Sequence, residues 1–204
     1  MALAVAVTST ALAACGGSRQ NEDEPEGKFP VEVTTAKFPN RQRLGATEEL
    51  KLAVKNVGDQ TIPNLAINIF IDEGADGSFS IRLDQPDLAK PDRPVWILEN
   101  GFPRLKGKKT PAGGETAQTN TFAFGALPPD QEKKVVWRLT AVRGGTYQLN
   151  YRISAGLFGK AQAVTDEETI PSGTFVVTIS TKPPDTRVNE KGEVVTGKAR
   201  PLGP

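Results

Sequence analysis

Hydrophobic and polar residues alternate with a period of two over much of the chain between residues 29 and 181. Successive side chains of a strand point to opposite faces, so this alternation predicts strands with one buried and one solvated face. The clearest case is residues 147–154, where every odd position is apolar or aromatic and every even position is polar. Similar alternation covers residues 50–55, 65–72, 79–83, 135–140 and 175–179, with shorter candidates at 31–33 and 122–124.

Turn-forming sequences separate these segments, at residues 56–59, 127–130 and 143–145. No segment keeps the 3.6-residue apolar repeat of a helix, and we expect residues 161–169 to form one helical turn at most. Strands of parallel sheets are buried on both faces, whereas these strands are half polar. Seven or eight short strands of this kind therefore predict antiparallel sheets packed face to face.

Two longer stretches resemble the immunoglobulin-like modules of bacterial surface proteins. The stretch EELKLAVKNVGDQTIPNLAINIFID, residues 48–72, is similar to their first half: a strand, an N-x-G turn, a proline-marked crossover and a second strand. The stretch FAFGALPPDQEKKVVWRLTAVRGGTYQLNYRI, residues 122–153, is similar to their second half. The resemblance is to the bacterial cell-adhesion-related domain, over residues 31–72 and 118–181, and implies an all-β, immunoglobulin-like antiparallel β-sandwich of seven to eight strands. It also implies that Tyr147 occupies a sheet corner, where its hydroxyl bonds back to the backbone.

Residues 73–118 do not fit this module, and we interpret them as a long loop insertion. Connections of this length are uncommon in compact domains and are often functional. The segment contains the apolar run VWILENGF at residues 95–102. Trp96 and Phe102 in this run are candidate partner-binding residues, because tryptophan is frequent at binding hot spots; a run this apolar also suits a core. The alternation places Trp137 on the inner face of its strand.

The chain begins with a short apolar segment. Residues 2–14 are small or aliphatic apart from three hydroxyl side chains, and the only cysteine, Cys15, follows them. A segment of this length is too short to span a bilayer as a helix but suits the apolar region of a signal peptide. Leu12, Ala13, Ala14 and Cys15 resemble a bacterial lipobox, whose cysteine receives a diacylglyceryl group and becomes the new N-terminus.

No lysine or arginine precedes Cys15, so we expect the true start to lie upstream or the signal peptide to be truncated. The alternative is a buried helix that ends at an ordinary core cysteine. The polar stretch that follows, GGSRQNEDEPEGK, has no aliphatic or aromatic side chain to pack against such a helix. We therefore predict a signal peptide (1–14), a lipidated cysteine with a flexible tether (15–28), the sandwich (29–181) and a disordered tail (182–204).

The residue types that are missing exclude several kinds of chemistry. The chain contains no histidine and one cysteine. Ser-His-Asp triads, Cys-His dyads, histidine metal sites, thiolate zinc clusters and intramolecular disulfides are therefore excluded. With 25 basic and 24 acidic residues, the net charge of +1 offers no broad attraction to nucleic acid, so we expect no nucleic-acid partner. No motif indicates a cofactor.

Charged clusters supply the remaining candidate sites. Asp72, Glu73 and Asp76 surround two glycines and are candidate metal ligands, since calcium takes six to eight oxygen ligands from such loops. The bidentate glutamate of a twelve-residue calcium loop is missing, so a solvated acidic turn is the alternative. The basic cluster at residues 106–109 is either a contact for anionic headgroups or wall polymers, or a solvated loop. Residues 166–168 are interpreted as an acidic surface loop.

These features predict a membrane-anchored extracytoplasmic lipoprotein with a non-enzymatic role in binding, adhesion or envelope scaffolding. The expected partners are the lipid bilayer, through acylated Cys15, and other envelope proteins or wall polymers. Addition of a strand to an exposed sheet edge is a binding mode available to such folds. The alternative is a small-ligand or calcium-binding subunit of a surface complex. A carboxylate-pair hydrolase ranks third, and no motif marks its substrate.

Overall fold

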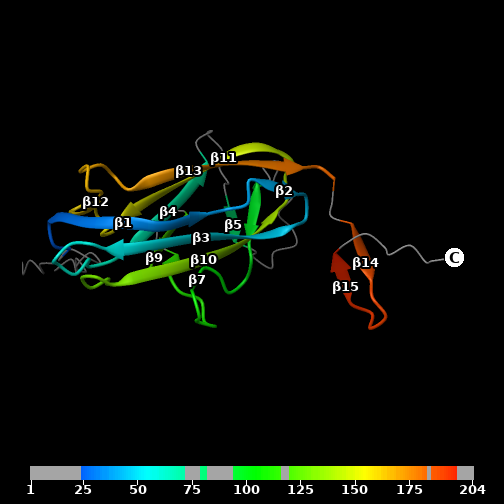
Figure 1. Cartoon of the computed structure of the whole chain (residues 1–204), viewed down its shortest axis with the longest axis horizontal. Helices are drawn as coiled ribbons and strands as arrows, with labels where there is room; N and C mark the ends of the chain where they lie inside the picture. The colour runs from blue at the N-terminus through cyan, green and yellow to red at the C-terminus, as the bar shows by residue number, and fades with distance from the viewer. Residues whose placement is uncertain (1–23, 72–78, 82–93, 116–119, 183–184, 197–204) are drawn as a thin grey trace, which may run out of the picture.

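The computed structural model of the protein describes residues 24–71, 79–81, 94–115, 120–182 and 185–196. All regular structure in these residues is β-strand, arranged as two main sheets and a separate hairpin (Figure 1). No helix in the described part of the chain is long and apolar enough to cross a membrane. The prediction of an all-β fold is confirmed.

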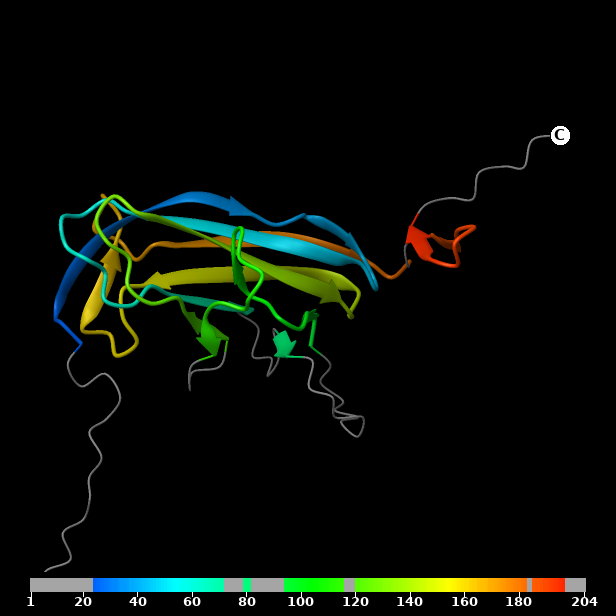
Figure 2. The ribbon, with the colours of Figure 1, turned by 90° about the horizontal axis from the view of Figure 1, so that it is seen from below.

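The two main sheets stack face to face (Figure 2). The first sheet contains, in spatial order, β12 (Ala161–Val164), β1 (Gly27–Lys37), β3 (Thr47–Asn56), β10 (Glu132–Ala141), β6 (Trp96–Leu98) and β5 (Phe79–Ile81), and β7 (Arg104–Leu105) also pairs with β10. The second sheet contains β2 (Arg41–Arg43), β13 (Ser172–Ser180), β11 (Gly145–Ser154), β4 (Ala66–Ile71), β9 (Thr121–Ala123) and β8 (Gly114–Glu115). The hairpin consists of β14 (Thr186–Val188) and β15 (Val194–Thr196).

The core lies between the two sheets because each long strand turns its apolar side chains inward. In β11, Leu149, Tyr151 and Ile153 are buried, whereas Gln148 and Arg152 are exposed. The long strands follow the predicted alternation except at Ala53 of β3 and Asn150 of β11, which are also buried, and the immunoglobulin-like sandwich is confirmed. The strands beyond the seven or eight that were predicted are short. Three pairings depart from the predicted antiparallel arrangement, since β1 with β12, β2 with β13 and β5 with β6 pair in parallel.

β12 occupies the segment in which we expected a helical turn. Ala161 and Ala163 are buried and Gln162 is exposed, so this short segment keeps the alternation of a strand. Its parallel pairing covers the beginning of β1. Alanine has a weak strand preference, and the pairing with β1 outweighs it.

Part of the predicted loop insertion belongs to the sheets, since its described residues form β5, β6, β7 and β8. Trp96, in β6, has no exposed surface, and its indole Nε1 donates a hydrogen bond to Gln42 Oε1 at 2.8 Å. Its ring contacts those of Phe38 and Tyr147, at centroid separations of 5.7 and 5.9 Å. The insertion is therefore anchored in the core through Trp96.

Tyr147 closes the corner at the beginning of β11. Its hydroxyl donates to the carbonyl of Gly144 at 2.8 Å, so the expected sheet-corner role is confirmed. Gly145 has a φ of +145°, and a Cβ at this position would lie 2.7 Å from the tyrosine oxygen. Both the backbone conformation and the close approach therefore require glycine.

Both ends of the domain differ from the expectation. β1 begins at Gly27, inside the predicted tether, and Glu24 already contacts the sandwich. In the predicted disordered tail, β14 and β15 pair as a hairpin. Its turn forms because Asn189 Oδ1 accepts hydrogen bonds from the backbone N–H groups of Lys191 and Glu193, at 3.0 and 2.9 Å.

The two buried tryptophans differ in one hydrogen bond. Trp96 and Trp137 have exposures of 0% and 1%, but the indole N–H of Trp137 has no hydrogen-bond partner among the described residues. Trp96→Phe leaves the buried Gln42 oxygen without its donor, which costs about 1–3 kcal/mol beyond the lost ring area. Trp137→Phe removes an unpaired donor, so its free energy of unfolding should fall by less. Urea unfolding of the two variants measures this difference, and equal losses would contradict it.

Candidate binding surface

Several predicted site residues lie outside the residues that the structure describes. They are the lipobox and lipidation residues Leu12, Ala13, Ala14 and Cys15 and the candidate metal ligands Asp72, Glu73 and Asp76. Within the described ranges, no three His, Cys, Asp or Glu side chains gather in a way that could hold a metal ion. Lipidation of Cys15 and the acidic calcium site stay predictions.

The structure separates the two candidate partner-binding residues. Trp96 is enclosed in the core and presents no surface to a partner, which corrects that prediction. Phe102 is half-buried, and two guanidinium groups lie near its ring. The Cζ atoms of Arg104 and Arg138 lie 4.3 and 5.6 Å from the centroid of its ring. A cation within about 6 Å of the face of an aromatic ring is attracted to the ring, so Phe102 helps to hold both arginines in place.

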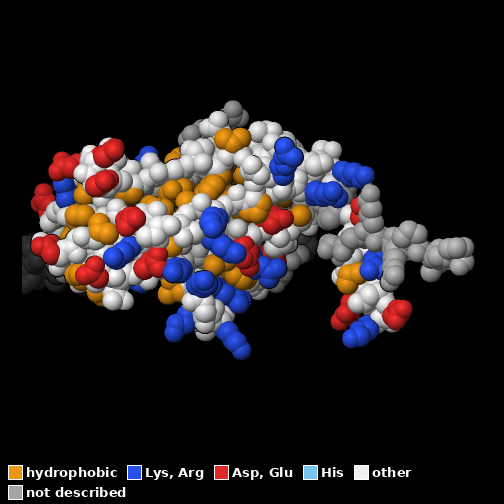
Figure 3. Space-filling model, in the orientation of Figure 1, with side chains coloured by type: hydrophobic (Ala, Val, Ile, Leu, Met, Phe, Trp, Pro, Cys, Tyr) orange, Lys and Arg blue, Asp and Glu red, His pale blue; other side chains and the backbone are white. Residues whose placement is uncertain are grey.

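Basic side chains surround Phe102 on the outer face of the first sheet. Arg104 of β7 lies opposite Val136 of β10, and Arg138 of β10 lies opposite Glu49 of β3. This register brings basic residues from three strands and one turn onto one surface, the blue area below the centre of Figure 3. We call this surface the basic face; it comprises Lys51, Arg104, Lys106, Lys108, Lys109, Lys134 and Arg138.

The turn after β7 presents three of these lysines to solvent. The backbone N–H of Lys106 donates to the carbonyl of Lys134 at 2.8 Å, and that of Lys108 donates to the carbonyl of Leu105 at 2.9 Å. Gly107 adopts a φ of 82°, which glycine reaches without strain. The backbone thus fixes the turn, while its three lysine side chains stay exposed.

Acidic neighbours neutralise part of the basic face. Lys134 Nζ lies 2.7 Å from Glu132, and Lys51 Nζ lies 2.8 Å from Glu49. The hydrogen bond from Lys134, together with one from Thr34, lowers the pKa of Glu132. In the part of the chain that the structure describes, no carboxylate forms an ion pair with the three lysines of the turn. Their charge is therefore available to an external anion.

Lys133, next to the basic face, has a structural role instead. Its Nζ donates to the carbonyls of Phe124, Gly125 and Ala126 at 2.6, 3.1 and 2.7 Å. Burial lowers the pKa of Lys133. An ammonium group has three hydrogen-bond donors, and all three are used by these carbonyls. Lys133 therefore holds the loop before β10 and has no donor left for a ligand.

Glu24 pins the loop between β11 and β12, a contact that the sequence did not predict. Its carboxylate accepts hydrogen bonds from the backbone N–H groups of Leu157, Phe158 and Ala161 at 2.8–2.9 Å. A Cβ at Gly156 would lie 2.2 Å from a Glu24 oxygen, so glycine is needed there for the carboxylate to approach. Burial alone would raise the pKa of Glu24, but the backbone donors outweigh it and lower the pKa. No sequence signal distinguishes Glu24 from the other acidic residues around it.

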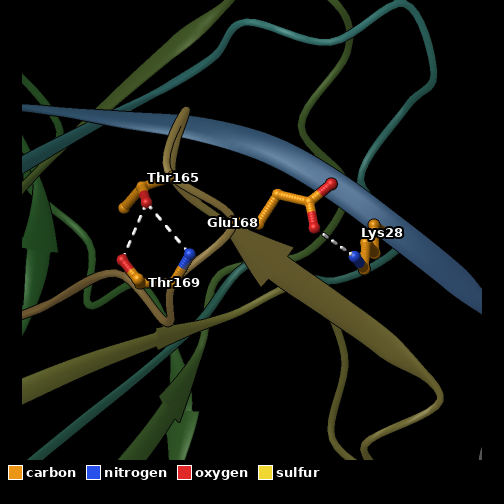
Figure 4. Close-up of polar contacts among 4 residues, drawn as sticks. All are labelled: Lys28, Thr165, Glu168 and Thr169. Atoms are coloured by element: carbon orange, nitrogen blue, oxygen red, sulfur yellow. Dashed lines mark hydrogen bonds and ion pairs between the residues drawn. The ribbon is translucent and has the colours of Figure 1, made fainter.

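A groove of about 650 Å³ lies at the same end of the molecule. It is lined by Arg152, Asn68, Lys28 and Glu168, together with the exposed apolar side chains of Phe158 and Ile170 and others. Lys28 Nζ lies 2.9 Å from Glu168, which ties β1 to the loop after β12 (Figure 4).

The loop after β12 is closed by its own threonines (Figure 4). Thr165 Oγ1 lies 2.8 Å from Thr169 Oγ1 and accepts from the Thr169 backbone N–H at 3.2 Å. The residues interpreted as an acidic surface loop therefore form a tight, exposed turn.

No protein-family model and no curated protein sequence matches the chain. Among solved structures, the CARDB domain of the PF1109 protein from Pyrococcus furiosus is 15% identical, with a TM-score of 0.42 over 76% of this chain and 94% of that domain. A cohesin module from a Clostridium perfringens family 33 glycoside hydrolase is 11% identical, with a TM-score of 0.43 over 76% and 98%. A PapD-like domain of human CEP192 is 12% identical, with a TM-score of 0.37 over 88% and 100%. Likeness of this degree carries no information about activity or partners.

Glu24→Gln should destabilise the protein, because a charge-assisted acceptor of several backbone donors becomes a neutral amide. We expect a loss of about 1–3 kcal/mol in the free energy of unfolding at neutral pH. The folded pKa lies below the unfolded value, so this contribution is full above the unfolded pKa and is lost as the pH falls through the folded pKa.

Urea unfolding of both proteins at pH 7 and at about pH 3, below the usual glutamate pKa, measures this effect. The difference between wild type and Glu24→Gln should shrink at the lower pH. Glu26→Gln is the matched control, because Glu26 is exposed and two residues away. Equal effects of the two substitutions would show that Glu24 does not hold the loop.

Proposed function

We propose that this protein is a membrane-anchored extracytoplasmic lipoprotein with a non-enzymatic binding role in adhesion or envelope scaffolding. The sequence Leu12-Ala13-Ala14-Cys15 supports the anchor, and the immunoglobulin-like sandwich supports a binding role. A cysteine that carries two acyl chains attaches stably, whereas one chain binds only reversibly. Residues 16–23 connect the cysteine to Glu24, whose carboxylate contacts the sandwich.

The basic face is the observation that carries the proposal. Net charge is close to zero over the whole chain, so attraction to anions is confined to the surface where positive charge gathers. Among the described residues no carboxylate pairs with the three lysines of the fixed turn, and Phe102 adds apolar area beside the turn. This combination suits a phosphate-bearing polymer of the cell wall, which offers repeated negative charge. The lipid anchor would keep the domain within reach of that polymer.

A second candidate function is the binding of a small ligand. The groove of about 650 Å³ falls in the size range of small-molecule sites, roughly 300–1,000 Å³. Arg152 and Asn68 offer polar contacts in it, and Phe158 and Ile170 offer apolar ones. A ligand-dependent rise in melting temperature, with calcium among the ligands tested, would favour this function.

Removal of the turn lysines tests the binding role. The triple variant Lys106→Gln, Lys108→Gln and Lys109→Gln should bind inorganic polyphosphate at low salt roughly ten- to a hundredfold more weakly, since each such charge contributes about 1 kcal/mol near an anionic surface and screening reduces this. A control with Lys37, Lys182 and Lys191 changed to glutamine removes the same charge from other exposed positions.

Titration calorimetry with polyphosphate and co-sedimentation with anionic vesicles separate a wall polymer from a membrane surface. The proposal expects polyphosphate binding that the control retains and the turn variant loses. Absence of binding by the wild type, or equal losses in both variants, would contradict it. Binding to vesicles alone would assign the basic face to lipid headgroups instead.

A further inference from the structure

The outer edge of β13 is unpaired over most of its length among the described strands. On one side β13 pairs with β11 from Ser172 to Ile179. On its other side it pairs only with β2, through residues 178–180. Residues 172–177 therefore form an open edge on the margin of the sandwich, where β2 adjoins only the far end of β13 (Figure 1).

The backbone groups of this edge point outward at alternate residues. Ile153 N donates to the carbonyl of Pro171 at 2.8 Å, so odd-numbered residues of β13 direct their N–H and C=O groups to β11. Ser172, Thr174 and Val176 therefore direct theirs away from it. At the end of the strand an outward-directed group of this kind already has a partner: Thr178 N donates to the carbonyl of Asn40 at 2.9 Å, beside β2. A further strand can continue this pattern.

The β13 edge lacks the devices that usually prevent edge pairing. Proteins blunt such edges with charged residues, prolines, bulges or very short strands. β13 reads SGTFVVTIS, with no charge and no proline, and its Val176 is 55% exposed. β1, on the same side of the sandwich, has a bulge between Val33 and Thr35 and carries Glu32 and Lys37. The contrast singles out β13 as an edge built to be paired.

We propose that β13 pairs antiparallel with β13 of a second copy of this chain. An uncharged edge is self-complementary, because two copies bring no like charges together along the paired strands. A two-fold axis through Thr174 places Thr174 opposite itself and Val176 opposite Ser172 of the other copy. Phe175 then faces Gly173, which has no side chain to obstruct it.

The neighbouring strand β1 adds charge complementarity to this arrangement. Residues 31–33 of β1 and residues 171–172 at the beginning of β13 line the same hollow of about 400 Å³, so these two short segments lie near each other along the sandwich. β1 and β13 run in the same direction (Figure 1). The two-fold axis through Thr174 relates the position of Ser172 to that of Val176, four residues further along the strand. On β1 the bulge adds one residue over this distance, so Glu32 of one copy comes toward Lys37 of the other. Opposite charges meet along the rim, while the β13 edges pair at the centre.

Sedimentation velocity on the purified full chain, kept reduced so that Cys15 forms no disulfide, tests the dimer. We expect a monomer–dimer equilibrium within concentrations up to roughly 1 mM, the effective concentration that tethering can impose. Val176→Lys should weaken the dimer at least tenfold, because each copy then places an added charge on the paired edge. Val188→Lys is the matched control, a 65% exposed valine in the hairpin.

A cross-linking experiment tests the register. In a Cys15→Ser background, Thr174→Cys should form an intermolecular disulfide on oxidation, because paired Cα atoms about 5.5 Å apart suit a disulfide. Thr178→Cys, which lies beside β2, should not. A chain that stays monomeric, or a dimer that Val176→Lys leaves intact, would overturn the proposal. A dimer that Val176→Lys dissolves but Thr174→Cys does not cross-link would overturn the antiparallel register.

Discussion

The rest of the structure depends on one constraint: each long strand has a single apolar face, and the apolar faces of the two sheets must cover each other. Two aromatic bridges hold them together. Trp137 of the first sheet meets Phe122 of the second at a centroid separation of 6.1 Å, and Trp96 meets Tyr147 at 5.9 Å. Each indole buries on the order of 150–250 Å² in such a position. The aromatic rings therefore fix the two sheets against each other, and the outer faces of the sheets are not needed for core packing.

The solvent-exposed outer faces and margins of the sheets are where the candidate surfaces lie. Because the inner face of β10 is committed to the core, Lys134 and Arg138 must point outward, and β7 adds Arg104 and the lysine turn beside them. The same packing leaves the margin between β1 and β13 partly uncovered, since β12 and β2 each extend only one end of it. Glu24 fixes the point at which the chain enters the domain. The positions of the basic face, the β13 edge and the Glu24 contact thus all follow from how the two sheets pack.

Much of the fold was predictable because alternation is a local property of the sequence. The strand at residues 147–154 follows from residues close together in the chain, and the corner hydroxyl of Tyr147 was expected from the resemblance to immunoglobulin-like modules. β12 was not predictable, since its segment AQAV becomes a strand only through pairing with β1, far away in the sequence. Trp96 was ambiguous for a similar reason: a short apolar run suits a core or a contact equally until a neighbouring strand covers it.

The candidate site was predictable only in part. The lysines at residues 106–109 are visible as a cluster in the sequence. That they lie on the same surface as Arg138 depends on the register between β7 and β10. The role of Glu24 depends on donors more than 130 residues away. Long-range pairing, not local composition, decides these contacts.

The proposed function depends on position, because a domain proposed to act by binding alone has its effect only where it is held. The covalent state of Cys15 is therefore the most direct test. Intact-mass spectrometry of the protein extracted from cell membranes should show a chain that starts at Cys15 and carries a diacylglyceryl group. A chain with an unmodified Cys15 thiol, recovered from the soluble fraction, would contradict the account.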